Sequence, residues 1–314
     1  MNRVALDFGV IQIYWYSIFI LLAIFAGLTI VFMETKRLGK NDDEIMGLLI
    51  NAIIVGIIGA RLYFVIFNFS YYSKNILEIF EIWNGGLAIH GGILFGAIYI
   101  YLHCKKKRID LLSLLDGTAM GLLLGQAIGR WGNFFNQEAF GAVTEAAKLK
   151  SLGLPNFIIE GMKIDGLYRQ PTFLYESIWN LIGFIIMFSF RKHKYLKKGT
   201  LFSFYLIWYS LGRIVIEGMR SDSLMLGPIR VAQLISIALI ALGIFIIVKQ
   251  NKGTKLDRLY NEVKVKVTNV EAQVTATPER DYGVKKFVNE DISNIIDNDD
   301  DKYWQGHFFV LIYT

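Results

Sequence analysis

Between residues 129 and 138 the chain places several polar side chains directly after an apolar stretch. The segment reads G-R-W-G-N-F-F-N-Q-E and contains Arg130, Asn133, Asn136 and Glu138. Arginine and asparagine can donate hydrogen bonds to an anion, whereas the glutamate carries a negative charge of its own. Such groups at the edge of a hydrocarbon layer are costly unless they are paired or functional. One satisfied polar residue at a helix end would be ordinary, but four together indicate a binding or catalytic site.

The composition is that of an integral membrane protein. Of the 314 residues 54% are hydrophobic, 19% are charged and four are proline. The formal net charge of +6 arises from short basic clusters between apolar runs. This pattern is typical of membrane orientation signals and not of a nucleic-acid-binding surface. The single cysteine, Cys104, excludes an internal disulfide, and no cysteine–histidine cluster has metal-ligand spacing. We therefore expect no metal, no other cofactor and no nucleic-acid partner.

The apolar segments predict a protein that crosses the membrane several times as α-helices. A membrane-spanning helix needs about 20 mostly apolar residues. Seven segments of the sequence are candidates: 10–33, 45–67, 86–103, 109–129, 172–190, 199–219 and 229–248. The first is expected to be a retained span, because no short basic region and small-residue cleavage site mark it as a signal peptide. The expected fold class is therefore all-α, with seven transmembrane helices.

The distribution of lysine and arginine predicts how these helices are oriented. Twelve basic residues occupy three short connections, at 34–44, 104–108 and 191–198, whereas seven are spread over longer stretches on the other side. Because cytoplasmic loops are rich in lysine and arginine, the N-terminus is expected outside and the C-terminus in the cytoplasm. The connection at 131–170 is long enough to form a small external cap between spans four and five.

Residues 1–248 are expected to form one membrane domain. After Val248 the sequence becomes polar and includes an acidic cluster between Glu290 and Asp301. Segments of this kind bury too little apolar surface to fold alone. We therefore expect residues 249–314 to be a flexible cytoplasmic tail.

With this topology nearly all costly polar residues fall at the external end of the helices. His90 lies near the outer end of the third span, and Arg130 ends the fourth. On the sixth span Arg213 and Glu217 are four residues apart and share one helix face. Other polar residues are expected at the same depth: Tyr14, Tyr16, Arg61, Glu176, Tyr209, Arg220, Arg230 and Gln233. Asp116 is the exception, because it lies deeper toward the cytoplasm.

A polar site in one leaflet fits lipid headgroups better than it fits a passage through the membrane. A pore would spread polar residues through the bilayer, and a transporter would gather them at its midplane. Several arginines indicate an anionic ligand, and the planar guanidinium suits phosphate. Without a carboxylate cluster for Mg²⁺ or Ca²⁺, metal-dependent phospholipid synthases and phosphatases are disfavoured. A lipid or anion transporter with an outer-leaflet phosphate site is the alternative, and a phospholipid hydrolase lacks a visible serine–histidine pair.

Some of these residues also have a purely structural interpretation. Arg61 could be a counter-ion for Glu138 or Glu176, and Tyr16 could belong to an aromatic belt at the membrane interface. His90 could be a satisfied interface histidine. Two glycines directly follow His90 and let a ligand or another segment come close, which favours a functional role.

The order and spacing of these residues resemble the bacterial prolipoprotein diacylglyceryl transferases over roughly residues 1–250. Segment 129–138 is similar to the signature of that family and is the specific part of the match. Four shorter motifs are also similar: Trp15-Tyr16, His90-Gly91-Gly92, Pro171 through Tyr175-Glu176, and Arg213-x-x-x-Glu217. The tail from Lys249 onward is longer than the family pattern.

The resemblance implies a transferase that acts on a lipid and on a secreted protein precursor. The diacylglyceryl group of phosphatidylglycerol would move to the lipobox cysteine thiol in the signal peptide of a prolipoprotein. A thioether forms and glycerol phosphate leaves, which is the first step of bacterial lipoprotein maturation. The resemblance also implies a multi-pass protein of the bacterial plasma (inner) membrane, embedded in the lipid bilayer with its active site toward the external face.

The chemistry of this reaction suggests roles for the predicted site residues. A free thiol with a pKa of about 8.5 is mostly protonated at neutral pH, so its proton must be removed or its thiolate stabilised. His90 is a suitable base, although a thiol pKa lowered by arginine would serve as well. Arg130 and Arg213 are expected to stabilise the leaving phosphate. The resemblance assigns the phosphatidylglycerol site to Tyr16, Arg130, Asn133, Asn136, Glu138 and Glu217, with Glu217 orienting Arg213.

Overall fold

The computed structural model describes residues 2–9, 12–221, 223–251 and 259–261. The described residues include seven helices of at least 19 residues, joined by short strands and helical turns. The long helices are α1 (Trp15–Arg37), α2 (Asp42–Phe67), α4 (Ile89–Lys107), α5 (Leu111–Asn136), α8 (Thr172–Phe190), α9 (Thr200–Met219) and α10 (Val231–Asn251). Each predicted apolar segment falls on one of these helices.

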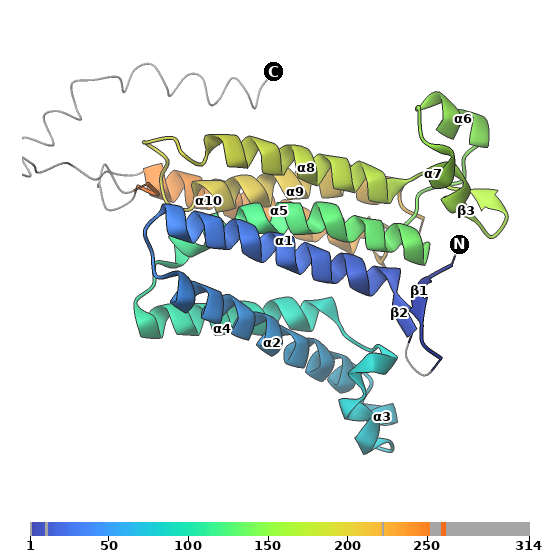
Figure 1. Ribbon diagram of the computed structural model, residues 1–314, viewed down its shortest axis with the longest axis horizontal. Helices are drawn as coiled ribbons and strands as arrows, with labels where there is room; N and C mark the ends of the chain where they lie inside the picture. Colours follow the sequence, from blue (N-terminus) through green and yellow to red (C-terminus); the bar gives the residue numbers. More distant parts are fainter. Residues whose placement is uncertain (1, 10–11, 222, 252–258, 262–314) are drawn as a thin grey trace, which may run out of the picture. The chain divides into compact units, whose positions relative to one another are not determined.

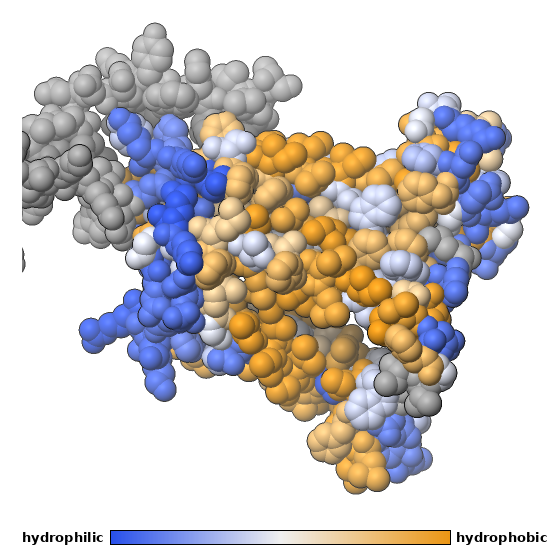
Figure 2. All heavy atoms as spheres, in the orientation of Figure 1, coloured by the Kyte–Doolittle hydropathy of each residue, from blue (hydrophilic) through white to orange (hydrophobic). Residues whose placement is uncertain are grey.

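Five of the described helices are long and apolar enough to cross a membrane: α1, α2, α5, α8 and α10. Helices α4 and α9 are not among these five, since three lysines end α4 and α9 carries Arg213 and Glu217 together with several tyrosine and serine residues. Figure 2 shows hydrophobic side chains over the middle of the helices and hydrophilic ones toward their ends. The prediction of an all-α membrane protein is therefore confirmed, with five candidate spans in the described part of the chain.

Helix α5 is the centre of the helix bundle. It packs on α1, α8 and α9, while α10 packs on α9 and α2 pairs with α4 (Figure 1). Glycine allows the close approach of α1 and α5, since a Cβ on Gly121 would lie only 2.6 Å from the carbonyl oxygen of Gly27. Small residues at four-residue spacing let membrane helices approach in this way. Helix α5 can therefore carry a polar site at its end while its middle is fixed by three neighbours.

The first helix begins at Trp15, later than the predicted residue 10. Strands β1 (Val4–Asp7) and β2 (Gln12–Tyr14) form an antiparallel hairpin before it. The N–H group of Trp15 donates to the carbonyl oxygen of Arg3 at 3.1 Å. Because these backbone groups are already paired across the hairpin, strand β2 does not join the helix.

Helix α5 ends at Asn136, well past the predicted end at residue 129. Asp110 caps its start by accepting a hydrogen bond from the N–H group of Ser113 at 2.9 Å. Gln137 ends the helix in a left-handed conformation, with φ of 54° and an N–H group directed at the carbonyl oxygens of the last turn. The expectation that a loop begins at Trp131 is therefore wrong. The polar residues of segment 129–138 do not interrupt the helix, which ends only at the left-handed Gln137. Most of segment 129–138 is helical.

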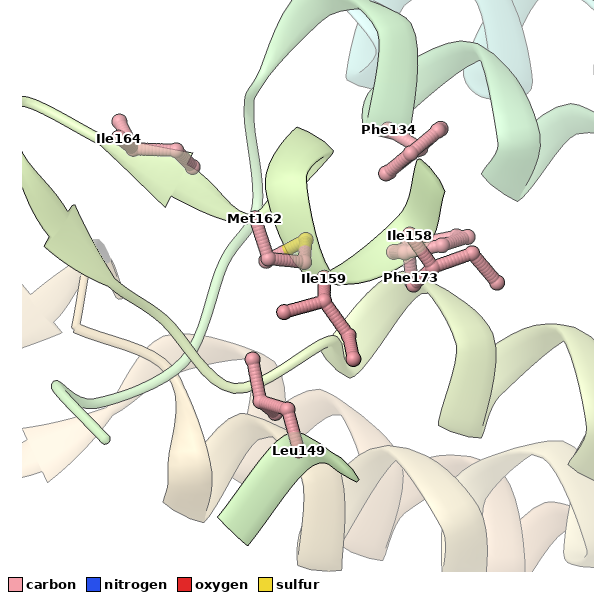
Figure 3. Close-up of a cluster of buried hydrophobic side chains, with 7 residues drawn as sticks. All are labelled: Phe134, Leu149, Ile158, Ile159, Met162, Ile164 and Phe173. Atoms are coloured by element: carbon pink, nitrogen blue, oxygen red, sulfur yellow. The ribbon is translucent and has the colours of Figure 1, made fainter. Parts of the chain in front are cut away.

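A small folded cap connects α5 to α8. It consists of α6 (Ala146–Ser151), α7 (Asn156–Gly161), β3 (Lys163–Ile164) and β4 (Leu167–Tyr168). Its buried core, drawn in Figure 3, contains Phe134, Leu149, Ile158, Ile159, Met162, Ile164 and Phe173. Phe134 belongs to α5 and Phe173 to α8, and their rings stack with centroids 4.6 Å apart. The core of the cap thus fixes the last turns of α5 against the first turn of α8.

The connection between α2 and α4 is held by Arg61. It contains α3 (Phe69–Tyr72) and two 3-10 helices, η1 (Ile76–Phe80) and η2 (Ile82–Asn84). Nε of Arg61 donates to the carbonyl oxygen of Ile79 at 2.8 Å, Nη1 to that of Gly85 at 2.9 Å, and Nη2 to that of Glu78. Arg61 therefore binds backbone carbonyls and is not a counter-ion for Glu138 or Glu176.

Asp116 caps the start of α9 from within α5. Its carboxylate is fully buried and accepts from the N–H groups of Gly199 at 2.6 Å and Phe202 at 2.8 Å. The first N–H groups of a helix have no partner within the helix, so a buried carboxylate is a suitable acceptor for them. This contact accounts for the polar residue that lies apart from the others.

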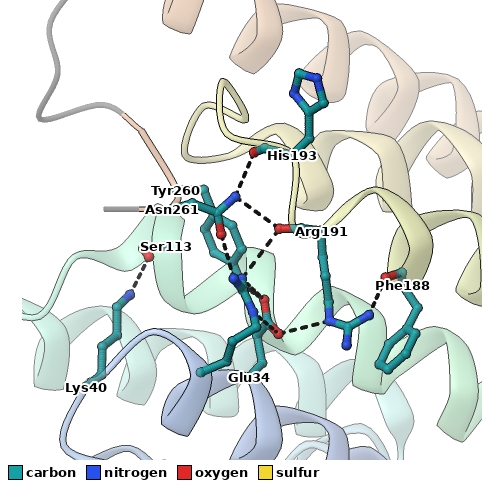
Figure 4. Close-up of polar contacts among 9 residues, drawn as sticks. Glu34, Lys40, Ser113, Phe188, Arg191, His193, Tyr260 and Asn261 are labelled. Carbon is teal, nitrogen blue, oxygen red and sulfur yellow. Dashed lines mark hydrogen bonds and ion pairs between the residues drawn. The ribbon is translucent and has the colours of Figure 1, made fainter. Parts of the chain in front are cut away.

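At the end of the bundle opposite the cap (Figure 1), Tyr260 and Asn261 pack against α1 and the α8–α9 connection (Figure 4), and Leu259 forms a β-bridge with Lys197. Tyr260 is 1% exposed, and its hydroxyl donates to Glu34 at 2.9 Å. Asn261 accepts from Nη1 of Arg37 at 2.7 Å and donates to two carbonyl oxygens of the α8–α9 connection. The predicted tail at 249–314 falls mostly outside the described residues, and the domain boundary at residue 248 stays a prediction.

Candidate active site

The ends of three helices bring four charged residues together. Arg130 lies in the last two turns of α5, Glu176 in the second turn of α8, and Arg213 and Glu217 in the last two turns of α9. Helix α8 runs opposite to α5 and α9, so its first turns meet the last turns of both. The cap core fixes the end of α5 to the start of α8, and a short connection joins α8 to α9, so these residues meet although they are far apart in the sequence.

Glu176 bridges the two arginines. Its Oε2 lies 2.7 Å from Nη2 of Arg130, and its two oxygens lie 3.1 and 3.3 Å from Nη1 of Arg213. Oε2 of Glu217 lies 2.7 Å from Nη2 of Arg213, one helix turn away on α9. Arg213 thus lies between two carboxylates, and Arg130 shares one of them. We call these four residues the arginine network.

The carboxylates of the arginine network are more deeply buried than its guanidinium groups. The side chains of Glu176 and Glu217 are 4% and 3% exposed, whereas those of Arg130 and Arg213 are 19% and 16% exposed. Buried carboxylates need partners, because an unpaired buried charge is strongly destabilising. Each guanidinium has five N–H groups, so donors remain after these ion pairs form. An approaching anion would meet the guanidinium groups before it met the carboxylates.

Segment 129–138 continues the polar surface beyond Arg130. Nη1 of Arg130 lies 3.5 Å from Oδ1 of Asn133, which is a long hydrogen bond. Asn136 follows one turn later and donates to Glu138 at 3.3 Å. Glu138 is exposed, just beyond the end of α5. The helical form of this segment therefore places both asparagines on the same side of α5 as Arg130.

Tyr16 lies against the same part of α5. A Cβ on Gly132 would lie 3.0 Å from the ring of Tyr16, so the absence of a side chain at this glycine makes room for the tyrosine. The neighbouring Trp15 stacks on Phe135 with ring centroids 5.0 Å apart. The first turn of α1 is thus fixed beside segment 129–138, as the sequence motif Trp15-Tyr16 suggested.

His90 lies on the neighbouring helix pair. It is the second residue of α4, and its exposed ring faces Tyr63 of α2 with centroids 6.4 Å apart. In the described part of the chain, no hydrogen bond or ion pair joins His90 to the arginine network. The glycine that follows His90 serves helix packing, because a Cβ on Gly91 would lie 2.5 Å from the carbonyl oxygen of Gly59 on α2. His90 is at the same end of the bundle as Arg130, since α4 and α5 run in opposite directions.

Among the described residues the structure joins four of the predicted site residues through Glu176, which was not itself predicted. Glu176 pairs with Arg130 and Arg213, Asn133 contacts Arg130, and Glu217 pairs with Arg213. Tyr16 lies beside the end of α5, while Asn136 and Glu138 lie at and just beyond that end. His90 lies on another helix. The signal that could have found Glu176 is a carboxylate inside an apolar span, which is costly without a positive partner. No group of three or more His, Cys, Asp or Glu residues in the described ranges is placed to hold a metal ion.

Sequence comparison identifies the family. The family model for prolipoprotein diacylglyceryl transferase matches residues 3–249. The chain belongs to the prolipoprotein diacylglyceryl transferase family. The match covers α1 to α9 and most of α10, and with them the whole arginine network. The resemblance inferred from the sequence motifs is confirmed.

Similar members of this diacylglyceryl transferase family come from Streptococcus pneumoniae. The phosphatidylglycerol–prolipoprotein diacylglyceryl transferase of strain JJA is 47% identical over 253 residues, covering 80% of this chain and 95% of that relative. The protein of the same name from strain ATCC 700669 is 46% identical with the same coverage.

Proposed function

We propose that this chain transfers the diacylglyceryl group of phosphatidylglycerol to the lipobox cysteine of prolipoproteins. The name of its relatives gives phosphatidylglycerol and a prolipoprotein as their substrates. The observation that carries the proposal is the arginine network. One buried carboxylate holds two guanidinium groups together where a phosphodiester headgroup could reach them. Planar guanidinium groups suit the paired oxygens of a phosphate.

The reaction exchanges a carbon–oxygen bond for a carbon–sulfur bond. The substrate sulfur attacks the glyceryl carbon that carries the phosphate oxygen. The C–S bond forms as the C–O bond breaks, and the bonding electron pair stays on the oxygen of the departing glycerol phosphate. The thiol proton passes to a base. Negative charge therefore grows on the leaving phosphate, and this is the charge that the protein must stabilise.

Arg130 and Arg213 stabilise the leaving phosphate in this proposal. Glu176 and Glu217 hold the guanidinium groups in place before the lipid binds, so little reorganisation is needed when charge develops. Asn133 and Asn136 offer amide donors to the headgroup, and Tyr16 borders the same surface of α5. The paired carboxylates of this proposal orient arginines and take no part in bond making.

His90 is the proposed base. Histidine is the side chain that exchanges protons near neutral pH, and the exposed ring of His90 is accessible to a substrate at this end of the bundle. The competing route is a thiol whose pKa is lowered by the nearby arginines. The two routes differ in pH dependence, which a variant of His90 would reveal.

The proposed setting is the bacterial plasma membrane, crossed seven times, with the arginine network at the external face. Basic residues support this orientation. Helices α1 and α4 end in Lys36-Arg37 and Lys105-Lys106-Lys107, at the end of the bundle opposite the arginine network. Positively charged ends of membrane helices face the cytoplasm. The N-terminus is then external, and the chain after α10 is cytoplasmic.

A lipid or anion transporter would need a polar route to the cytoplasmic end. The residues that could have marked such a route have structural partners instead. Asp116 caps α9, and Gln126 donates to the hydroxyl of Tyr205 at 3.0 Å. These contacts favour a transferase over a transporter.

The test is a direct transfer assay. Purified protein in detergent is mixed with phosphatidylglycerol and a lipobox peptide, and the peptide is weighed by mass spectrometry. We expect its mass to rise by one diacylglyceryl group, with equimolar release of glycerol phosphate. A peptide with serine in place of the cysteine is the control and should gain nothing. An unmodified cysteine peptide, with protein that is folded and lipid that is accessible, would contradict the proposal.

A further inference from the structure

Helices α8 and α9 carry the same five-residue pattern, Trp-x-x-x-Gly. Trp179 precedes Gly183 on α8, and Trp208 precedes Gly212 on α9. The two indole rings stack, with centroids 4.3 Å apart and planes 14° from parallel. Each indole N–H group donates to the main-chain carbonyl oxygen of the other tryptophan, at 2.9 Å in both directions. The contact is therefore reciprocal.

Each indole also occupies the space left by the glycine of the other helix. A Cβ on Gly212 would overlap Nε1 of Trp179, and a Cβ on Gly183 would overlap Nε1 of Trp208. An indole N–H group without a partner is costly inside a membrane, and here both are satisfied across the interface. We call these four residues the Trp–Gly staple. The stacked rings, the two hydrogen bonds and the fit of each indole beside a glycine are all satisfied in only one register of α8 against α9.

The Trp–Gly staple lies directly beside the arginine network. Trp179 is three residues from Glu176 on α8, and Gly212 precedes Arg213 on α9. A shift of one residue between helices is a movement of about 1.5 Å along the axis. Such a shift would break the pairs between Glu176 and Arg213, whose oxygen–nitrogen distances are 3.1 and 3.3 Å. The register of α8 against α9 therefore decides whether the second arginine meets its carboxylate.

We propose that Trp179 and Trp208 are positioning residues for the transfer reaction. The Trp–Gly staple fixes the register of α8 against α9, and this register holds Arg213 against Glu176 in the geometry that grips phosphate. The inference rests on the proposed function, and neither tryptophan is assigned a contact with the lipid. Both act through Glu176 and Arg213.

A matched control comes from another close contact of α9. A Cβ on Gly243 of α10 would lie 3.0 Å from both Ile207 and the carbonyl oxygen of Ser203. Gly243→Ala therefore strains the packing of α9 on its other side, away from the Trp–Gly staple. A merely structural role for the Trp–Gly staple predicts that Gly212→Ala and Gly243→Ala behave alike at equal loss of stability.

The first measurement tests the geometry of the two indoles without using activity. Two stacked indoles couple their electronic transitions and give a paired positive and negative band in circular dichroism. Trp179→Phe and Trp208→Phe should each remove the same band pair from the full-length protein. Trp83→Phe, at a residue that is 76% exposed, should leave the band pair unchanged. A band pair that survives either staple substitution would overturn the inference.

The second measurement tests positioning through Arg213. Misplacement of a catalytic group by about 1 Å can cost about a hundredfold in rate, so Gly212→Ala should lower kcat strongly in folded protein. Because the guanidinium would already be displaced, adding Arg213→Lys should then cost much less than it does in the wild type. In the Gly243→Ala protein the full cost of Arg213→Lys should remain. Trp179→Phe, which keeps an aromatic ring and loses the N–H donor, replaces Gly212→Ala if that variant does not fold.

The outcomes separate this inference from the proposed function. If the double variant lowers kcat by the product of the two single reductions, the Trp–Gly staple does not act through Arg213. Wild-type kcat in Trp179→Phe and Trp208→Phe would also overturn the inference, with the transferase function left intact. If the wild type transfers no lipid, the proposed function fails. The circular dichroism result still decides whether the Trp–Gly staple forms.

Discussion

Oε2 of Glu176 on α8 lies 2.7 Å from Nη2 of Arg130 on α5, and the same carboxylate binds Arg213 on α9. One buried negative charge therefore joins three helices and keeps two positive charges close together. Without it the guanidinium groups would repel one another and lose their shared orientation. A site for an anion gains from this arrangement, because both groups of N–H donors are in place before the ligand arrives.

Glu176→Gln should destabilise the protein and reduce turnover. The amide keeps the shape of the side chain but removes the charge that two arginines share. Breaking a fully buried pair costs about 3–5 kcal/mol, and the partial exposure of the guanidinium groups should reduce that figure. Thermal unfolding in detergent and turnover per folded molecule measure both effects. Glu138→Gln, at an exposed carboxylate, is the control and should leave the unfolding temperature unchanged. Equal unfolding temperatures for the two variants would show that Glu176 carries no structural charge.

The membrane helices could be predicted from the sequence because their signal is local. A run of apolar residues determines a span in a bilayer, and each predicted segment falls on a long helix. The basic clusters and the motif at 129–138 can also be read within short stretches of sequence. The clusters predict the orientation, and the motif indicates the family. The end of α5 could not be placed in this way. A left-handed Gln137 ends that helix, and no composition change marks its position.

The contacts within the site could not be predicted, since they depend on how helices meet. Glu176 was visible as a carboxylate at the start of a span, but its two partners lie on other helices. His90 and Arg130 were expected at one depth and do lie at the same end of the bundle. They belong to different helices, and a shared depth does not reveal whether two side chains meet. The sequence does contain a pattern for the Trp–Gly staple, because the spacing Trp-x-x-x-Gly occurs in two consecutive helices. Only the packed structure shows that the two patterns face each other.

Single cysteines should report the orientation of the chain in intact cells. In a Cys104→Ser background, Lys74→Cys is placed on the connection between α2 and α4, and Lys194→Cys on the connection between α8 and α9. Both positions are exposed in the structure. We expect a membrane-impermeant thiol reagent to label position 74 and to label position 194 only after the cells are opened. Labelling of position 194 from outside would place the arginine network at the wrong face of the membrane.

Two truncations should separate the packed part of the C-terminal segment from the rest. Removal of everything after Val263 keeps Tyr260 and Asn261 and should leave the unfolding temperature unchanged. Removal after Gly253 takes both residues away from Glu34 and Arg37, and the unfolding temperature should fall. Burial and the neighbouring Glu34 carboxylate raise the pKa of Tyr260. Its hydroxyl therefore stays protonated and can donate at neutral pH.

Neither truncation should change turnover per folded molecule, because these contacts lie at the end of the bundle opposite the arginine network. Tyr260→Phe removes one hydrogen bond to a charged carboxylate from the full-length chain and should cost about 1.5–3 kcal/mol. Identical unfolding temperatures for the two truncated proteins would show that residues 259–261 contribute nothing to the bundle.

His90→Gln should reveal which group accepts the thiol proton. Glutamine keeps a hydrogen-bonding side chain of similar reach and removes the titrating imidazole. If His90 is the base, turnover falls strongly and loses its dependence on pH near neutrality. The pH profile of kcat with a lipobox peptide is the measurement. A variant with reduced turnover and an unchanged pH profile would give His90 a positioning role and assign thiolate stabilisation to the arginines.

The central claim is that Arg130 and Arg213 grip a phosphate and are not merely counter-ions for Glu176 and Glu217. Lysine keeps the positive charge but loses the planar pair of N–H donors. The loss of one preorganised donor typically costs about a hundredfold or more in rate. The most direct measurement is therefore turnover per folded molecule of Arg130→Lys and Arg213→Lys in detergent, with phosphatidylglycerol and a lipobox peptide. We predict that both variants fold and insert normally yet transfer little lipid, whereas turnover near the wild-type rate in both would contradict the phosphate grip.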